Sequence, residues 1–155
     1  MAETATSERP ELLPPTYWFG CALLMIAIHV FFPLFQWSDP ALTYAGLGFI
    51  AAAGALGGWA AWTFQRHGTP IHPFESTRCL VTAGPYRYSR NPMYLSLLIT
   101  LLGLWLLLGS VTPAVMVIAF ETIISTRFIE PEERALESRY GDAFRRYRSS
   151  VRRWI

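Results

Sequence analysis

The sequence predicts an all-α integral membrane protein with about four transmembrane helices and a C-terminal amphipathic helix on the cytoplasmic surface. Two observations lead to this fold class. First, 52% of the 155 residues are hydrophobic and only 15% are charged, which indicates that the chain is surrounded largely by lipid. Second, all thirteen cationic residues are arginine, and they lie outside the apolar segments or at their ends. A chain of this length is expected to form one domain, over residues 1–155.

The apolar segments define the expected helices. Residues 1–15 are polar and contain three prolines, so we expect a loosely ordered tail without the features of a secretory signal. Four apolar segments follow, at Tyr17–Phe35, Leu42–Phe64, Met93–Leu108 and Val111–Phe128. Three of them have the length of about 20 residues that a helix needs to cross a bilayer. The segment Met93–Leu108 is shorter and requires tilt, a locally thinner membrane or a partly buried end.

The positions of the arginines predict the orientation of these segments. Arg9 precedes the first segment, four arginines lie in the connection 65–91, and eight follow from Arg127 onward. The connections 36–41 and 109–110 contain none. Four crossings therefore place every arginine, and both termini, on the cytoplasmic side, as the positive-inside rule requires. The net charge of +2 is explained by contact with anionic headgroups, so we expect no nucleic acid partner.

Small residues indicate how the segments pack. Gly54-x-x-x-Gly58 in the second segment allows close approach of another helix, within the bundle or at a dimer seam, and the oligomeric state is left open. Gly109-Ser110 leaves little room between the third and fourth segments, which predicts a tight antiparallel hairpin. Cys21 lies within the first segment and Cys79 in the cytoplasmic connection. The two cysteines should not pair, so no disulfide framework is expected.

The chain changes character after Phe128. Pro131 suits the first turn of a helix, and Glu132 and Glu133 suit the positive end of its dipole. Beyond them, apolar residues recur at helical spacing while arginines occupy the other faces: the apolar positions are Leu136, Tyr140, Phe144 and Tyr147. This pattern predicts an amphipathic surface helix over Pro131–Arg148, with Trp154 as an interfacial anchor.

The strongest indication of function is the stretch 84–94, Gly-Pro-Tyr-Arg-Tyr-Ser-Arg-Asn-Pro-Met-Tyr, at the start of the third apolar segment. Asn91 is a good N-cap residue and Pro92 fits a first helical turn, so a helix begins here with backbone N–H groups free to bind an anion. Tyr86 and Tyr94 are suited to stack on a flat base or to face a cation. An aromatic belt with positive-inside arginines is the structural alternative. The clustering favours a charged ligand bound at the membrane surface.

Acidic residues are expected to join this cluster. The hairpin of the third and fourth segments returns Glu130, Glu132 and Glu133 to the side of Asn91. A carboxylate there can hold the ammonium group of an amino-acid-like ligand, although acids are also common in any first helical turn. Arg127, at the membrane boundary, can grip an acidic substrate head or extend to lipid phosphates.

Two ionisable residues lie inside apolar segments. His29 and Glu121 are candidates for function because charges in lipid are costly, and their roles stay open. His67 and His72 lie in the polar connection. Neither has a spacing to Cys79 that suggests a metal site, so we expect no metal.

Three blocks in order along the chain resemble the isoprenylcysteine carboxyl methyltransferase family. They are Leu80-Val81-Thr82-Ala83-Gly84-Pro85-Tyr86, then Arg90-Asn91-Pro92-Met93-Tyr94, then, after a hydrophobic hairpin, Glu132-Glu133, Leu136, Gly141 and Tyr147. The family consists of integral membrane enzymes that use S-adenosylmethionine, and it includes bacterial phospholipid-methyltransferase-like proteins. The match covers about residues 78–154. Eukaryotic members have His-Pro at Asn91-Pro92 and Gly at Ser96, which leaves the substrate of this chain open.

The resemblance implies an S-adenosylmethionine-dependent methyltransferase of the bacterial inner membrane. The implied cofactor-binding residues are Arg78, Cys79, Leu80, Val81, Tyr86, Arg90, Asn91, Pro92, Met93, Tyr94 and Glu132. Glu132 would bind the amino group of the cofactor, and Arg127 lies near the family's substrate-gripping arginine. The implied partners are membrane lipids and a lipophilic or amphiphilic acceptor.

The acceptor itself is open. A carboxylate needs no general base and is our first expectation. A lipid amine or a thiol would need a deprotonating residue, for which Glu121 is the candidate. A non-catalytic membrane subunit with the same fold is the alternative outside enzymes. A nicotinamide-dependent reductase is disfavoured because the sequence has no phosphate-binding glycine motif.

Overall fold

The computed structural model describes residues 13–66 and 80–155, and these residues are helical without any strand. The elements are α1 (Pro14–Phe31), α2 (Pro40–Arg66), the short 3-10 helix η1 (Gly84–Arg87), α3 (Pro92–Leu108), α4 (Ala114–Ile124), the π-helix η2 (Ser125–Ile129), α5 (Glu130–Tyr140) and α6 (Asp142–Ser150). The all-helical prediction is confirmed. Of the predicted tail, residues 1–12 lie outside the described residues. The prediction was wrong for Pro14 and Pro15, which form the first turn of α1, where proline costs no hydrogen bond.

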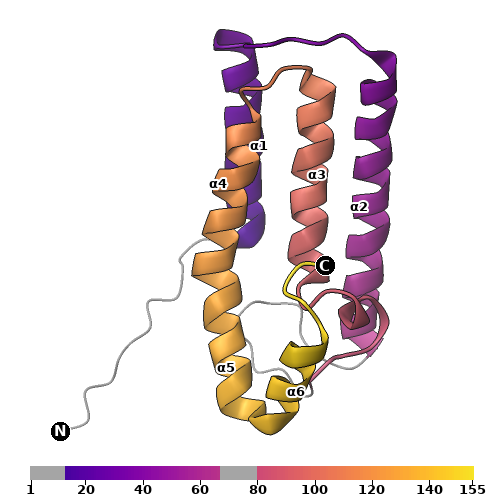
Figure 1. Ribbon diagram of the computed structural model, residues 1–155, viewed down its shortest axis with the longest axis vertical. Helices are drawn as coiled ribbons and strands as arrows, with labels where there is room; N and C mark the ends of the chain where they lie inside the picture. Colours follow the sequence, from indigo (N-terminus) through magenta and orange to yellow (C-terminus); the bar gives the residue numbers. More distant parts are fainter. Residues whose placement is uncertain (1–12, 67–79) are drawn as a thin grey trace, which may run out of the picture.

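Helices α1 to α4 run side by side, and α3 lies between α2 on one side and α1 and α4 on the other (Figure 1). Helices α2 and α3 approach closely where both carry small residues. A Cβ atom added at Gly46 would lie 2.8 Å from the carbonyl oxygen of Gly103, and one added at Gly57 would lie 2.8 Å from Ser96 Oγ. The pair Gly54 and Gly58 faces open space, so its predicted role in bundle packing was wrong. The contact with α3 falls on another face of α2, which the motif alone did not specify.

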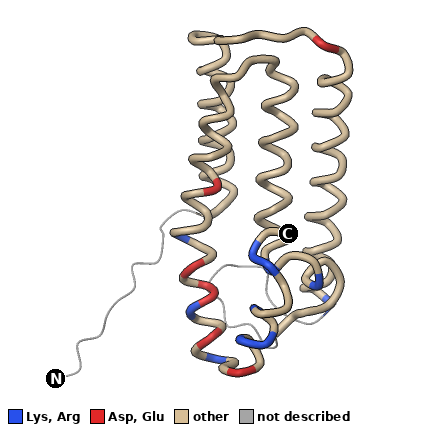
Figure 2. Tube along the Cα trace, in the orientation of Figure 1, with Lys and Arg blue, Asp and Glu red and all other residues tan. Residues whose placement is uncertain are grey.

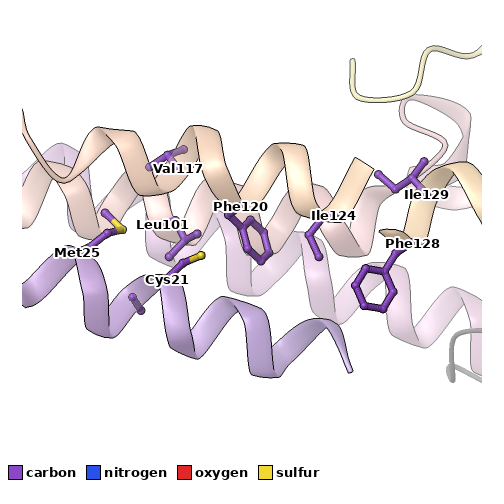
Figure 3. Packing of buried hydrophobic residues seen from close by; sticks show 9 residues of the cluster. Cys21, Met25, Leu101, Val117, Phe120, Ile124, Phe128 and Ile129 are labelled. Atoms are coloured by element: carbon purple, nitrogen blue, oxygen red, sulfur yellow. The ribbon is translucent and has the colours of Figure 1, made fainter. Parts of the chain in front are cut away.

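The apolar core lies between α1, α3 and α4. Met25, Leu101, Phe120, Ile124 and Phe128 are almost completely buried and contact one another across these helices (Figure 3). The core continues to the level of Phe128, whose ring contacts the rings of Tyr17 and Tyr94 at centroid distances of 5.7 and 6.4 Å. Packing therefore connects the bundle to the first turn of α3, where the candidate site begins.

Within residues 13–66 and 80–155, two helices have the length and composition of membrane spans, two fewer than the four predicted. They are α1, with 18 residues, and α2, with 27. In the most apolar 18-residue stretch of each helix, only 22% of α1 and 11% of α2 is buried within the protein. The apolar faces of both helices are therefore available to lipid. Helix α3 has 17 residues, and α4 has 11 before the π-helix interrupts its regular geometry. Both are apolar, but neither reaches the length of a standard span.

The connections 32–39 and 109–113 lie at one end of the bundle, which we call the hairpin end. Trp37 N donates to Gly109 O at 2.9 Å, and Val111 N donates to Leu34 O at 3.0 Å. Gly109 ends α3 with φ +73°, and a Cβ atom there would lie 2.7 Å from the backbone oxygen of Trp37. The tight hairpin predicted from Gly109-Ser110 is present, and only glycine fits its close contact with the other connection.

The predicted surface helix Pro131–Arg148 differs from the structure at its start and in its middle. It is no separate helix, because α4 continues through the π-helix into α5 without a break. Proline lacks an N–H group and crowds the carbonyl four residues earlier, and the wider π turn before Pro131 accommodates it. The amphipathic stretch then divides at Gly141, whose backbone angles of φ 48° and ψ −120° are open mainly to glycine, and α6 follows.

Candidate functional site

The charged residues of the described chain gather at the end of the bundle opposite the hairpin end (Figure 2). From Leu13 to Phe64 the sequence has one charged residue, Asp39, and from Met93 to Thr126 it has one, Glu121. The other end is formed by residues 84–91, α5, α6 and the C-terminal segment 151–155, and we call it the charged end. The prediction that the hairpin returns the glutamates of α5 to the side of Asn91 is confirmed.

At the charged end, Tyr94 in the first turn of α3 contacts Glu132 on α5. The Tyr94 hydroxyl donates to Glu132 Oε1 at 2.7 Å. Among the described residues, this carboxylate has no ion pair. Burial raises the pKa of Glu132 to about 7, the negative charge of Glu133 adds to this effect, and the hydrogen bond from Tyr94 opposes it. Part of the side chain remains accessible to solvent. A cation placed beside Glu132 would therefore find a carboxylate without a charged partner.

Tyr86 supplies a buried hydroxyl group that has no hydrogen-bond partner among the described residues. Its ring is buried against Phe64 at a centroid distance of 4.9 Å and packs with Val81 and Met93. The Tyr86 hydroxyl is buried without a hydrogen-bond partner in the described part of the chain, whereas its backbone oxygen accepts from the Tyr147 hydroxyl at 2.7 Å. Burial raises the pKa of Tyr86, so the phenol keeps its proton and remains a donor. Such a group normally has a partner, which a bound ligand can provide.

The turn that carries Tyr86 is pressed tightly against α2. Gly84 begins η1 with φ +59°, and a Cβ atom there would lie 2.8 Å from Thr63 Oγ1. The Thr63 hydroxyl also donates to Trp59 O, which fixes its position within α2. Gly84 is therefore required both by its left-handed backbone and by the close approach of α2, and together these position Tyr86.

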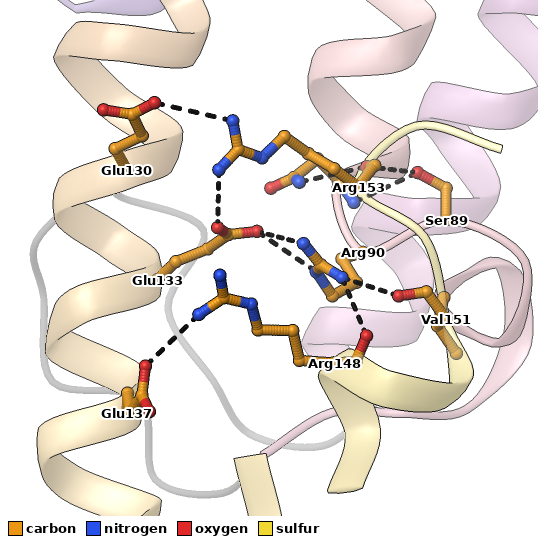
Figure 4. A network of polar contacts seen from close by, with 9 residues as sticks. Ser89, Arg90, Glu130, Glu133, Glu137, Arg148, Val151 and Arg153 are labelled. Carbon is orange, nitrogen blue, oxygen red and sulfur yellow. Dashed lines mark hydrogen bonds and ion pairs between the residues drawn. The ribbon is translucent and has the colours of Figure 1, made fainter. Parts of the chain in front are cut away.

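Glu133, the neighbour of Glu132, is paired with two arginines (Figure 4). Arg90 Nη2 lies 2.7 Å from Glu133 Oε1, and Arg153 Nη2 lies 2.9 Å from Glu133 Oε2. Arg153 Nη1 also lies 3.6 Å from Glu130 Oε1. Burial alone would raise the pKa of Glu133, but hydrogen bonds from Arg153 and Arg90, together with their charges, hold it below its usual range. The two adjacent glutamates thus have opposite environments.

The loop before α3 binds the C-terminal segment. Arg90 N donates to Arg152 O at 3.0 Å, and Arg90 Nη1 donates to Val151 O at 2.7 Å. Ser89 Oγ and Asn91 Nδ2 both donate to Arg153 O, at 3.2 and 3.1 Å. The C-terminal segment is therefore part of the charged end.

These contacts correct the capping role expected of Asn91, while the expected contact of Arg90 and Asn91 with a cofactor stays a prediction. Helix α3 begins at Pro92, as predicted, with Asn91 at the N-cap position. However, the Asn91 side chain makes no capping hydrogen bond and binds the carbonyl of Arg153 instead. Arg90 is likewise bound to Glu133 and to the C-terminal segment. Both residues connect the start of α3 to the C-terminal segment, and Arg90 also connects it to α5. Spacing along the sequence could not indicate these contacts.

The other expected site residues are distributed as follows. Arg78 and Cys79 lie outside the described residues. Leu80 is half-buried and Val81 is buried beside Tyr86. Pro92 is buried, and Met93 packs against the Tyr86 cluster. Sequence reasoning did not identify Arg153 or the pairing of Glu133, for which the only signal was an excess of arginine near the C-terminus.

Three further residues were expected near the site. Arg127 is exposed and makes no ion pair with the described residues, so the structure does not bring it into the Tyr94–Glu132 contact. Glu121 Oε1 accepts hydrogen bonds from Ser125 Oγ at 2.8 Å and Trp154 Nε1 at 3.2 Å. His29 Nδ1 lies 2.8 Å from Ser110 Oγ, near the hairpin end.

Comparisons with known proteins identify the family. The family model for phospholipid methyltransferases matches residues 41–143, from α2 into the start of α6. The chain belongs to this family, which includes the isoprenylcysteine carboxyl methyltransferase-like membrane methyltransferases, and the predicted resemblance is confirmed. Membership implies a methyltransferase associated with a membrane.

The chain is also similar to an uncharacterized protein of Haemophilus influenzae (strain ATCC 51907 / DSM 11121 / KW20 / Rd). The two are 48% identical over 63 residues, which are 41% of this chain and the whole of that protein. No solved structure matches the chain.

Proposed function

We propose that this protein is an S-adenosylmethionine-dependent methyltransferase that acts on a lipophilic or amphiphilic acceptor in the membrane. Family membership supports methyl transfer, and one observation supports this donor. Glu132 is a crowded carboxylate that has a hydroxyl partner, Tyr94, but no cationic partner among the described residues. S-adenosylmethionine carries an ammonium group, a complementary charge for that position.

The residues at the charged end suit the proposed cofactor. Glu132 would hold its ammonium group, with Tyr94 fixing the carboxylate from the other side. The unsatisfied Tyr86 hydroxyl would donate to the nucleoside part, and Val81 and Met93 would form the apolar wall around it. Arg78, Cys79 and Leu80 complete the proposed site through the family resemblance.

The cofactor would supply an activated methyl group on a sulfonium. The protein therefore needs no metal and no covalent intermediate, and its task is to align donor and acceptor and to exclude water. The site suits this task because its side chains come from well-packed helix ends. Tyr94 is in the first turn of α3, and Glu132 is on the helix that continues from α4.

We propose four membrane crossings by α1, α2, α3 and the helix that begins with α4, with both termini in the cytoplasm of a bacterial cell. Large apolar side chains are exposed on the outer faces of α1, α2 and α4, including Leu23, Phe49 and Ile118, and α3 lies between these helices. At 1.5 Å per residue, the 17 residues of α3 cover about 25 Å, so the membrane must thin slightly around it. The charged end then faces the cytoplasm. Modification of a cysteine introduced at Ser38 by a reagent confined to the cytoplasm would contradict this orientation.

A carboxylate is the acceptor that we favour. Arg127 lies three residues before Glu130, and its exposed guanidinium has no ion pair in the described chain, so it is available to a ligand. A guanidinium holds both oxygens of a carboxylate at once. The phospholipid named in the family's description favours a lipid amine as the second candidate. In that case the oxygen of Glu121 that now binds Trp154 and Ser125 would have to exchange partners to take up a proton.

The proposal is tested with purified protein, labelled S-adenosylmethionine and a lipid extract of the host. We expect label in a lipophilic product with the wild type and a strong reduction with Glu132→Gln. If the wild type neither transfers label nor binds S-adenosylhomocysteine at high micromolar concentrations, the protein is a non-catalytic subunit and the proposal fails.

Arg127 separates the two acceptor classes. If the acceptor is a carboxylate, Arg127→Ala should reduce methyl transfer by about a hundredfold, because a misaligned acceptor reacts slowly, and Arg127→Lys should recover part of it. Cofactor affinity should stay unchanged. Full activity of Arg127→Ala would eliminate the carboxylate and leave the amine.

A further inference from the structure

We propose that Arg153 is a positioning residue of the cofactor site: by holding Glu133, it keeps Glu132 as the carboxylate that receives the ligand's cationic group. This inference rests on the proposed function and extends it to the C-terminal segment. The Arg153 side chain pairs with Glu130 and Glu133 and not with Glu132 or Tyr94, so its effect on Glu132 is indirect.

The geometry starts from the two adjacent glutamates of α5. Glu133 Oε1 is occupied by Arg90 and Glu133 Oε2 by Arg153, so each of its oxygens has its own guanidinium (Figure 4). The exposed fraction of the Glu133 side chain is 10% and that of Arg90 is 9%. Glu133 is thus fully engaged and shielded, and only Glu132 is left to meet a cation at this level of α5.

Arg153 is itself held in place from two directions. Its guanidinium bridges Glu133 and Glu130, one helical turn apart on α5. Its backbone oxygen accepts from Ser89 and Asn91, in the loop that leads into α3 and to Tyr94. Arg153 therefore joins α5, which carries Glu132, to the loop that leads into α3, which carries Tyr94. The 2.7 Å contact between Tyr94 and Glu132 depends on the relative position of these two helices.

The next residue strengthens this arrangement. Trp154 packs against the core that also includes Tyr94, and its indole N–H donates to Glu121 on α4. The hydrogen bond from Trp154 to Glu121 is directional, so a shift of the segment 151–154 relative to α4 would break it. The C-terminal segment therefore fixes the position of Arg153 as well as its charge.

Loss of the Arg153 charge should be visible in the pH dependence of binding. Within the described residues, Glu132 faces Tyr94 from α3, Tyr86 from η1 and Glu133 from its own helix. The charge of Glu133 disfavours ionisation of Glu132, and Arg153 partly neutralises that charge. Without Arg153, Glu132 should ionise at higher pH, and binding of a cation should require that higher pH.

The experiment measures S-adenosylhomocysteine binding from pH 5.5 to 9 for Arg153→Gln and for its neighbour, Arg152→Gln. Both variants remove one positive charge, but the exposed Arg152 side chain makes no ion pair in the described chain. We expect the pH at half-maximal affinity to rise in Arg153→Gln only. At pH 7 its affinity should fall about twofold to fivefold, the loss expected when a titration near neutrality moves up by half to one pH unit.

Arg153→Lys is a second variant that tests the inference if Arg153→Gln does not fold. A lysine keeps the charge but cannot bridge Glu130 and Glu133 with a planar fork, so we expect a pH profile close to wild type with somewhat weaker binding. Equal profiles for Arg153→Gln, Arg152→Gln and the wild type would overturn the inference and leave the proposed function intact. An upward shift in Arg153→Lys equal to that of Arg153→Gln would also overturn it. Absence of binding by the wild type would reject the proposed function itself.

Discussion

The two ends of the helical bundle are closed by different interactions. At the hairpin end, the connections 32–39 and 109–113 are joined by backbone hydrogen bonds, including Trp37 N to Gly109 O, and by indole rings such as the Trp37–Trp105 pair. At the charged end, residues 89–91, α5 and residues 151–154 are joined by ion pairs and by side chains that bind carbonyl groups. The one charged residue of the described hairpin end, Asp39, accepts a hydrogen bond from Ala41 N, whereas the charged end leaves Glu132 without a cationic partner among the described residues.

This difference indicates which end of the bundle contributes to stability alone and which end also provides groups for ligand binding. The hairpin end holds the helices together and has little capacity for chemistry. The charged end contains a stabilising carboxylate and a carboxylate open to a ligand, since Glu133 is held by two arginines and Glu132, the preceding residue, has no cationic partner among the described residues. The following predictions test that division, beginning with the largest expected effect.

Removal of the Glu132 carboxylate should weaken binding of S-adenosylhomocysteine by about 2–5 kcal/mol, because a cationic group would lose its charged partner. Calorimetric or fluorescence titration of Glu132→Ala at pH 8, where Glu132 is ionised, measures this loss. Glu137→Ala is the matched control, since Glu137 is on the same helix and pairs only with the exposed Arg145 and Arg148. Equal affinities in the two variants would exclude Glu132 from the site.

Neutralising Glu133 should mainly reduce stability. Glu133→Gln removes the negative charge beside the Arg90 side chain, whose exposed fraction is 9%, and we expect a loss of about 3 kcal/mol in the free energy of unfolding. Denaturant titration in detergent checks this value. A loss confined to binding, with unchanged stability, would contradict the assignment of different roles to Glu132 and Glu133.

At the hairpin end, Gly109→Ala should destabilise the fold by about 1–2 kcal/mol without changing the cofactor affinity of the folded protein. The cause is the left-handed backbone of Gly109 and the contact its Cβ would make with Trp37 O. Gly48→Ala is the control, since a Cβ at Gly48 meets nothing within 4 Å and lies in a helix, where alanine is favoured. A fall in cofactor affinity in folded Gly109→Ala would show that the two ends are coupled.

The smallest net effect is expected on pH dependence. Burial raises the pKa of Glu132 to about 7 from an ordinary value of 4.5, so the ligand-free folded state holds a proton that the unfolded state releases. Taken alone, this shift should lower stability by about 2–3 kcal/mol as pH rises from 4.5 to 7, and Glu132→Gln should abolish this fall. The opposite change at Glu133 makes the net effect in the wild type smaller. Glu133 acts in the opposite direction, since its stabilisation is present above its ordinary pKa and is lost at lower pH. Unfolding midpoints at pH 5 and pH 8 compare the two states.

Much of the fold follows from local sequence patterns. The bounds of α1 and the start of α3 at Asn91-Pro92 were predicted within a few residues. Helix length and proline position depend on nearby residues alone, so the sequence is sufficient for both. The division of the amphipathic stretch at Gly141 was missed, since glycine is compatible with either a continuous helix or a break. The π turn before Pro131 was also missed, because its backbone geometry has no sequence signature.

The sequence by itself determined the family, the helical class and the chemical groups at the mouth of α3, since these depend on residue type and order. It also predicted that Glu132 and Tyr94 share one end of the bundle, because a hairpin returns the chain to its starting side. Only the tertiary structure decided which of two adjacent glutamates is paired. Glu133 meets Arg90 and Arg153, which lie 43 residues before it and 20 after it, and no local pattern specifies such contacts. The lack of a cationic partner for Glu132 among the described residues is a consequence of that packing.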